Sequence, residues 1–298
     1  MRAKRILLGA LAAIALGSGS ALPQTATSIP DFSGLWGRNA FDFEPASGSL
    51  KPIDNLVRLK NGAGNASMLV GDYNNPLLKP EAAAVVKRRG DLALAGASVP
   101  DPSNQCAPFA PPFTFSMELG VQLIQTADHI TFLYNQDDQV RRVWLNRAHP
   151  KDVKPSPMGD SVAYYEGDSL VVDTVGVATG PLAMIDRYGT PRSPSAHIVE
   201  RYRLIDGTTA KEAAERHIRE NGPMGLAGAV IVDPKYPGQG LQLEIRIEDP
   251  EVFTAPWSAV VTYRRTIGPW LEQICAEDTI DREQGRQPLM PISAKPDF

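Results

Sequence analysis

A β-hairpin is predicted by the residues Ser161-Val-Ala-Tyr-Tyr-Glu166-Gly167-Asp168-Ser169-Leu-Val-Val-Asp-Thr-Val175, and it indicates the fold class of the whole chain. The two flanking runs are rich in Val, Tyr, Thr and Leu, which pack well on a pleated surface. A Gly-Asp pair between such runs is typical of a tight hairpin turn. The chain is therefore expected to be a mainly β protein with antiparallel neighbours.

Six further strands are predicted on either side of this hairpin, because runs of strand-forming residues alternate with polar turns. Eight strands in all suggest an antiparallel, lipocalin-like barrel, since closure removes exposed edges and eight strands leave room for side chains or one small ligand. A β-sandwich remains the alternative, because strand spacing alone does not separate the two. The six strands are Val121–Thr126, Ile130–Asn135, Val140–Asn146, His197–Ile205, Leu241–Glu248 and Trp257–Ile267.

The barrel domain is expected to span residues 119–298, with an irregular N-terminal region, 22–118, packed on it. That region should contain a short strand at Phe32–Gly37 and a helix from Lys79 to about Gly90, with Pro80 in its first turn. A helix should also form within an insertion at 207–240, after a capping box made by Thr209 and Glu212. The insertion is interpreted either as a lid or as a surface excursion or oligomer contact.

The first 21 residues are predicted to be a secretory signal peptide. Basic residues precede an apolar run, Ile6–Gly17, that is too short to span a bilayer, and small residues then suit cleavage after Ala21. An N-terminal membrane anchor is the alternative. We expect an exported, periplasmic or secreted protein with no membrane span. The oligomeric state is left open.

Charge and cysteine content narrow the class of protein further. With 30 basic and 34 acidic residues, the net charge of −4 favours neither nucleic acid nor an anionic membrane as a partner. The two cysteines, Cys106 and Cys275, are expected to form one disulfide because an exported chain matures where disulfides persist. Two buried free thiols are the alternative. A catalytic thiol is disfavoured, since no basic cluster lies near either cysteine in sequence.

The strand from His197 carries charges on faces that should be buried. Period two places Glu200 and Tyr202 on one face and His197 and Arg201 on the other, so an ionisable group lies inside whichever face is inward. An inward Glu200 could pair with Arg142 or with Arg264 on another strand. A structural ion pair is the simpler interpretation for Glu200 and Arg201. His197 suits acid/base chemistry because an imidazole titrates near neutral pH.

Three long loops are expected at one end of an antiparallel barrel, which would make that end a ligand entrance. They follow the third, fifth and seventh strands. The first carries His149; the second carries Asp186, which could orient His197; and the third carries Phe253 and leads to Trp257. By the same parity the insertion opens at the other end, which weakens its interpretation as a lid. Simple solvation of the loop charges and a rigid aromatic corner are the alternatives.

No named catalytic motif is present. The sequence lacks a phosphate-binding loop, a dinucleotide-binding glycine pattern, a His-Glu-x-x-His pair and a Gly-x-Ser-x-Gly elbow. The four histidines are not closely spaced, so neither a metal nor another cofactor is expected.

Several motifs resemble those of an uncharacterised family of secreted bacterial proteins. They are Pro30-Asp-Phe-Ser-Gly-Leu-Trp36, Gly167-Asp-Ser-Leu-Val-Val-Asp-Thr174, His197-Ile-Val-Glu-Arg-Tyr202 and Glu248-Asp-Pro-Glu-Val-Phe-Thr-Ala-Pro-Trp257. The resemblance covers most of the chain and implies export and one shared fold. This chain departs from the pattern at Arg192, where similar sequences often have histidine, and in its insertion after Asp206.

These features together predict an exported barrel that binds a small organic molecule and performs cofactor-independent acid/base chemistry, as a lyase, isomerase or hydrolase. The predicted catalytic residues are His197, Asp186, Glu200 and Arg201. A non-catalytic ligand-binding barrel and a cell-envelope interaction protein are the alternatives. The predicted substrate-binding residues are Arg142, His149, Tyr202, Phe253 and Trp257.

Overall fold

The structure is a computed structural model that describes residues 29–38, 41–117, 120–221, 231–232, 235–267 and 275. The predicted signal peptide, 1–21, lies outside the described residues, as does part of the insertion, 222–230. No helix in the described ranges is long and apolar enough to cross a membrane.

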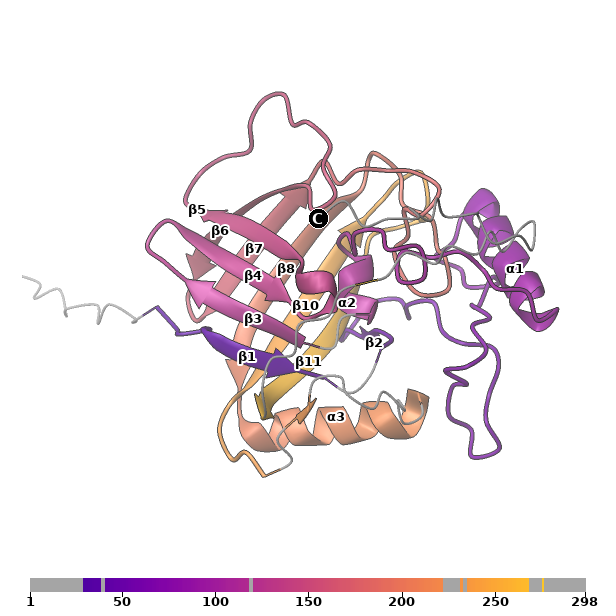
Figure 1. The fold of residues 1–298 in the computed structure, drawn as a ribbon, viewed down its shortest axis with the longest axis horizontal. Helices are drawn as coiled ribbons and strands as arrows, with labels where there is room; N and C mark the ends of the chain where they lie inside the picture. Colours follow the sequence, from indigo (N-terminus) through magenta and orange to yellow (C-terminus); the bar gives the residue numbers. More distant parts are fainter. Residues whose placement is uncertain are drawn as a thin grey trace, which may run out of the picture.

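A mainly β barrel forms the body of the molecule, as the sequence predicts (Figure 1). The eight strands expected from the sequence all form, each within one residue of its predicted bounds at either end. The wall follows the order β1, β3, β4, β5, β6, β7, β8, β10 and β11, and β1 pairs with β11 to close it. The strands are β1 (Gly34–Gly37), β3 (Gly120–Gln125), β4 (His129–Tyr134), β5 (Val140–Leu145), β6 (Asp160–Glu166), β7 (Ser169–Val175), β8 (His197–Ile205), β10 (Gly240–Glu248) and β11 (Trp257–Ile267).

The wall has nine strands where the sequence predicts about eight, because the short strand placed in the N-terminal region joins the wall. β1 pairs with both β3 and β11, and without it these two strands would present open edges. Gly34 is required at this seam: its φ is 131°, and a Cβ there would lie 1.6 Å from Nη1 of Arg265. Outside the wall, β2 (Glu44–Pro45) pairs with β11, as does β9 (Ile231–Val232).

The barrel is mixed rather than purely antiparallel, because β5 and β6 are parallel neighbours. The connection between them, 146–159, is long enough to return to the end of the barrel at which β5 began. The loops β7–β8 and β10–β11 still share one end, called here the loop end. The 146–159 loop starts at the other end and finishes at the loop end. The sequence predicts that the whole loop lies at the loop end, and only its last part does so.

The N-terminal region covers the loop end (Figure 1). Leu78 forms a β-bridge with Phe253 of the β10–β11 loop, and the Lys79 amide donates a hydrogen bond to the Val252 carbonyl. The helix predicted to stop at Gly90 continues, since α1 spans Pro80–Leu94. Gly90 is buried, and a Cβ there would lie 2.9 Å from Val70, so this glycine serves close packing instead of helix termination. The short helix α2 (Phe113–Met117) follows, and a single 3₁₀ turn, Gln136–Asp138, joins β4 to β5.

The helix predicted in the insertion forms as α3 (Gly207–Asn221) and lies across the opposite end of the barrel (Figure 1). Its N-terminus differs from the expected capping box. The Asp206 carboxylate accepts a hydrogen bond from the Thr209 amide at 2.9 Å and another from the Thr209 hydroxyl. It therefore supplies an acceptor for a backbone N–H of the first turn, which has no partner within the helix. Ala210 and Ala213 are buried where the helix packs on β10 and β11.

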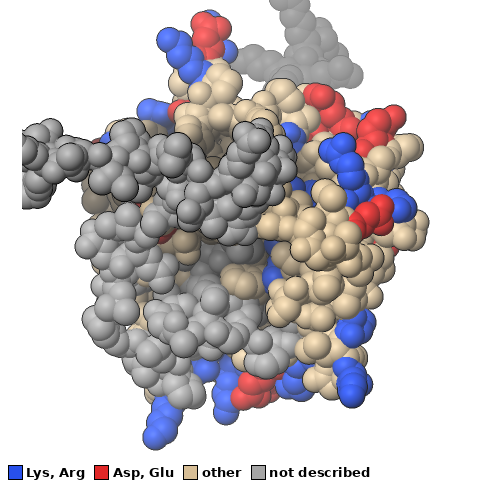
Figure 2. Space-filling model, turned by 45° about the vertical axis from the view of Figure 1, so that its right-hand side comes forward, with Lys and Arg blue, Asp and Glu red and all other residues tan. Residues whose placement is uncertain are grey.

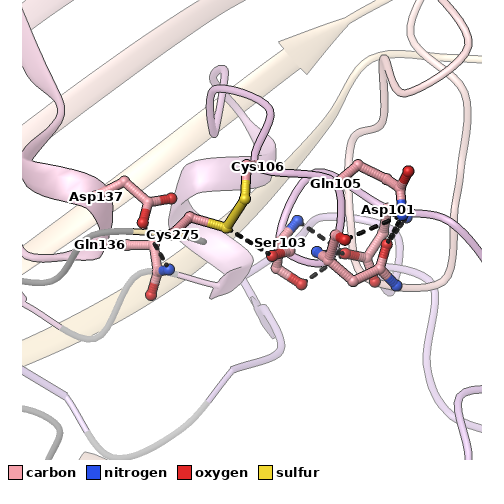
Figure 3. The surroundings of a disulfide bond; sticks show 8 residues. Asp101, Ser103, Gln105, Cys106, Gln136, Asp137 and Cys275 are labelled. Atoms are coloured by element: carbon pink, nitrogen blue, oxygen red, sulfur yellow. Dashed lines mark hydrogen bonds between the residues drawn. A yellow bond between two sulfur atoms is a disulfide. The ribbon is translucent and has the colours of Figure 1, made fainter. Parts of the chain in front are cut away.

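The predicted disulfide between Cys106 and Cys275 forms and ties the segment before β3 to the segment after β11 (Figure 3). The two cysteines are 169 residues apart in sequence, and cross-linking so long a loop stabilises the fold by about 2–5 kcal/mol in the chain-entropy view. A disulfide is compatible with an exported protein.

Candidate functional site

Two histidines and two aspartates form a chain of hydrogen bonds on the outer face of the barrel wall, toward the loop end. His197 Nε2 lies 2.8 Å from Asp173 Oδ1, and His149 Nε2 lies 3.2 Å from the same oxygen. His149 Nδ1 in turn lies 2.7 Å from Asp160 Oδ1. We call these four residues the outer cluster. Each side chain is partly exposed, between 21% and 36%.

Strand register brings the outer cluster together. Asp173 of β7 pairs with Val199 of β8, which places it diagonally opposite His197 on the same face. On its other side Asp173 pairs with Val162 of β6, so Asp160 is the second diagonal neighbour. His149 reaches this face from the 146–159 loop.

The protonation of His197 responds to this geometry. Its hydrogen bond with Asp173 raises the pKa of His197 above the usual value for a histidine, although burial opposes the rise. The same bond lowers the pKa of Asp173. Asp173 therefore holds a proton on His197 Nε2, and no hydrogen bond to His197 Nδ1 is found in the described part of the chain.

His149 differs because both of its ring nitrogens face carboxylates. His149 therefore bridges Asp160 and Asp173 and helps to hold the Asp173 carboxylate in place. Arg147 places a cation 2.9 Å from Asp160.

Glu200 points into the barrel and forms a buried ion pair with Arg141. Arg141 donates to both carboxylate oxygens, at 2.9 and 2.6 Å, and its remaining groups bond Ser161 and Thr174. The partner expected for Glu200 was Arg142 or Arg264; the adjacent residue Arg141 takes that place, because Arg142 points to the outer face. Burial would lower the pKa of Arg141, but the charge of Glu200 raises it.

Asp186 does not pair with His197. Its carboxylate accepts hydrogen bonds from the Tyr188 amide at 2.9 Å, the Thr190 amide at 3.2 Å and the Thr190 hydroxyl at 2.6 Å. These bonds close a tight turn within the β7–β8 loop. Burial raises the pKa of Asp186 to about 6, although the hydrogen bonds from Thr190 and Tyr188 oppose the rise.

The remaining predicted residues are dispersed. Arg201 lies on the outer wall and pairs with exposed Glu166 at 2.5 Å, and Arg142 lies over the ring of Trp144. Tyr202 is inside the barrel, where its hydroxyl donates to Glu200 at 2.7 Å. Burial raises the pKa of Tyr202 well above its usual value.

Phe253 and Trp257 are buried in the main hydrophobic core and contact each other edge to face at 5.5 Å. They anchor the β10–β11 corner beneath the N-terminal region. This packing fits the rigid aromatic corner considered as the alternative to a ligand contact.

The described residues outside the barrel line several cavities, and two of these have the volume of a small-molecule site. One, of about 320 Å³, is lined by Arg89, Arg187, Tyr188 and Asp101. The other, of about 520 Å³, lies between the segment 100–110 and the start of the β7–β8 loop, and Arg192 lines it. Basic and acidic side chains intermingle on the face shown in Figure 2. Within the described ranges no group of three or more histidines, cysteines and acidic residues has the geometry to hold a metal ion.

Comparison with family models, curated proteins and solved structures finds no match to this chain. Its function is therefore inferred from geometry alone.

Sequence reasoning missed Asp173 and Asp160 of the outer cluster, and it missed Arg141, the buried partner of Glu200. For Asp173 a signal was present, because period two places it opposite inward-facing Val172 and Thr174, and hairpin pairing would have set it near Asp160. For Arg141 the signal was ambiguous, because either Arg141 or Arg142 could face inward. Only the phase of the folded strand distinguishes the two.

Proposed function

We propose that this chain is an exported protein that transfers protons on a small organic substrate, with His197 as the general acid/base and Asp173 as its partner. Compared with the residues predicted from the sequence, the proposal replaces Asp186 by Asp173 as the partner of His197. It keeps His197 and His149 as residues of the site. The proposal concerns side-chain chemistry of the lyase, isomerase or hydrolase type. The resemblance to secreted proteins and the disulfide support export.

One observation carries the proposal: the Nδ1 atom of a half-exposed His197 has no described partner, while Nε2 is held by Asp173. In the neutral ring Nδ1 bears the lone pair and Nε2 bears the proton. Nδ1 can therefore take a proton from a substrate carbon or from an attacking water. The imidazolium that forms is stabilised by Asp173 and gives the same proton to the leaving group or to a new carbon.

His149 supports this step by holding Asp173 in position. It bridges Asp173 and Asp160, so the carboxylate of Asp173 keeps its orientation while the charge on His197 changes. We assign His149 as a positioning residue, because the described contacts place it on Asp173 rather than on the open side of His197.

The test is a screen of activated esters, epoxides and substrates for β-elimination with the wild-type protein, followed by His197→Gln and Asp173→Asn. General acid/base groups contribute about 10²–10⁴ in rate, so we expect His197→Gln to lose at least about 100-fold in kcat/KM. The matched control is His129→Gln, since His129 Nδ1 forms a similar 2.8 Å bond to Asp128 at the start of β4, three strands from Asp173 of β7.

The pH profile separates catalysis from a structural role. With His197 as the base, activity rises as pH rises through its pKa, and Asp173→Asn shifts that rise to lower pH because it removes the bond that raises the pKa. Equal losses in His197→Gln and His129→Gln, or no activity on any substrate class, would overturn the proposal.

A further inference from the structure

The cavity beside Arg192 has apolar walls and one buried cation. Its volume is about 520 Å³, within the range of small-molecule sites. Prolines, alanines and Leu182 make most of the wall, and none of the described residues that line it is acidic. Proline rings and short side chains lose little conformational entropy when a ligand binds, so the walls are largely preformed.

Among the described residues, the guanidinium of Arg192 donates hydrogen bonds to carbonyl oxygens and to no carboxylate. Arg192 is 95% buried and donates to the carbonyls of Pro111 at 2.9 Å, Met184 at 3.4 Å and Ala178 at 2.5 Å. Its Nε is buried and has no hydrogen-bond partner among the described residues.

No ion pair to Arg192 is found in the described part of the chain. The nearest acidic influence is Asp249, whose carboxylate instead accepts the amide and hydroxyl of Ser193 at 2.8 and 2.6 Å. Burial consequently lowers the pKa of Arg192 to about 10. A buried charge of this kind is normally paired, because isolated burial is costly.

We propose that this cavity is a binding site for an organic monocarboxylate with an apolar body, and that Arg192 receives the carboxylate. The single guanidinium matches one negative charge, and the fork of N–H groups suits carboxylate geometry. The proline and alanine walls exclude water from the apolar part of the ligand. The site is separate from the outer cluster and does not depend on the proposed acid/base chemistry.

The disulfide supports the cavity on one side. Gln105 and Ala107, which flank Cys106, both line the cavity, and Figure 3 shows Gln105 beside the bridge. The β7–β8 loop supplies the opposite wall through Ala178, Leu182 and Ala183. The site therefore joins the N-terminal region to the loop end of the barrel.

The experiment is calorimetric titration of the full chain with 4-phenylbutanoate, and with 4-phenylbutanamide as the uncharged probe of similar size. We expect one carboxylate per chain and at least about tenfold weaker binding of the amide, since charge-assisted hydrogen bonds are about twice as strong as neutral ones. Arg192→Gln should weaken carboxylate binding at least about tenfold and leave the amide within about twofold. His197→Gln should bind both probes as the wild type does.

A second pair of variants leaves Arg192 and its carbonyl contacts in place, should Arg192→Gln fail to fold by circular dichroism. Thr179 lines the cavity and is exposed, so Thr179→Glu adds a negative charge and Thr179→Gln is its neutral match. We expect only the Glu variant to weaken carboxylate binding. Absence of carboxylate binding by the wild type, equal affinity for both probes, or equal affinity of the two Thr179 variants would each overturn the proposal.

Discussion

Strand β8 carries two ionisable residues, His197 and Glu200, that lie three positions apart and in opposite environments. Glu200 faces inward, where Arg141 donates to both carboxylate oxygens and the Tyr202 hydroxyl donates to one of them. His197 faces outward, where Asp173 holds one ring nitrogen and the other has no hydrogen bond among the described residues. The first group stabilises the interior of the barrel, and the second is the group to which we assign proton transfer.

The difference between Glu200 and His197 follows from their exposure to solvent. Inside the barrel a charge without a partner is costly, so the charge of Glu200 is paired with that of Arg141. On the wall, water screens the charges and a histidine can exchange its proton without unfolding the protein. A charged residue within a strand therefore indicates chemistry only where one of its donor or acceptor atoms is not engaged by other protein groups.

The largest effect is expected from breaking the interior pair. Glu200→Gln removes the charge opposite Arg141 and should lower the free energy of unfolding by about 3–5 kcal/mol, measured by urea denaturation. The control is Glu166→Gln, which breaks the exposed pair with Arg201 and should cost no more than about 1 kcal/mol. Equal losses in the two variants would show that the interior pair is no more important than a surface pair.

A buried carboxylate that forms no ion pair among the described residues, Asp186, should respond differently to pH. Because the pKa of Asp186 is raised to about 6, the folded state binds this proton more tightly than the unfolded chain does. Its contribution to stability is present at acidic pH and should fall by about 2–4 kcal/mol as pH rises from about 4 to about 6. Urea unfolding of wild type and Asp186→Asn across that range tests this; parallel curves would contradict it.

Replacing both members of the interior pair should recover part of the loss. Arg141→Met combined with Glu200→Leu leaves no unpaired charge, and the Ser161 and Thr174 hydroxyls can bond each other. We expect this double variant to be about 2 kcal/mol more stable than Glu200→Gln in the same urea assay. A double variant less stable than the single one would mean that the pair itself stabilises the barrel.

The smallest effect is expected at the outer cluster. The Asp173–His197 bond stabilises the fold when Asp173 is ionised and His197 protonated. That contribution is lost as pH falls through the lowered pKa of Asp173 and as pH rises through the raised pKa of His197. Asp173→Asn should cost no more than about 1 kcal/mol at pH 5, because solvent screens the pair, and less at pH 9. A larger cost at pH 9 would contradict this assignment.

Local patterns anticipated much of the wall. The hairpin around Gly167-Asp168 and the alternation in Leu241–Glu248 depend on neighbours in sequence, and both form as expected. The parallel pairing of β5 with β6 was not predictable in this way, because a long loop permits either direction. The ninth strand was recognised as a strand, but not as part of the wall.

The candidate sites depended on the fold to a greater degree. His197 and His149 were recognised from residue type and loop position, whereas their shared partner Asp173 was not, because that contact requires the register of three strands. The pairing of Cys106 with Cys275 was predicted, since two cysteines allow only one intramolecular bridge.

The amino-acid sequence by itself determined the strands, the turns and the faces on which side chains alternate, because these depend on local propensity and a period of two. Only the tertiary structure decided which face became the interior, which of Arg141 and Arg142 met Glu200, and which carboxylate met His197. Those choices follow from closing nine strands into one wall, where burial and register act across distant segments.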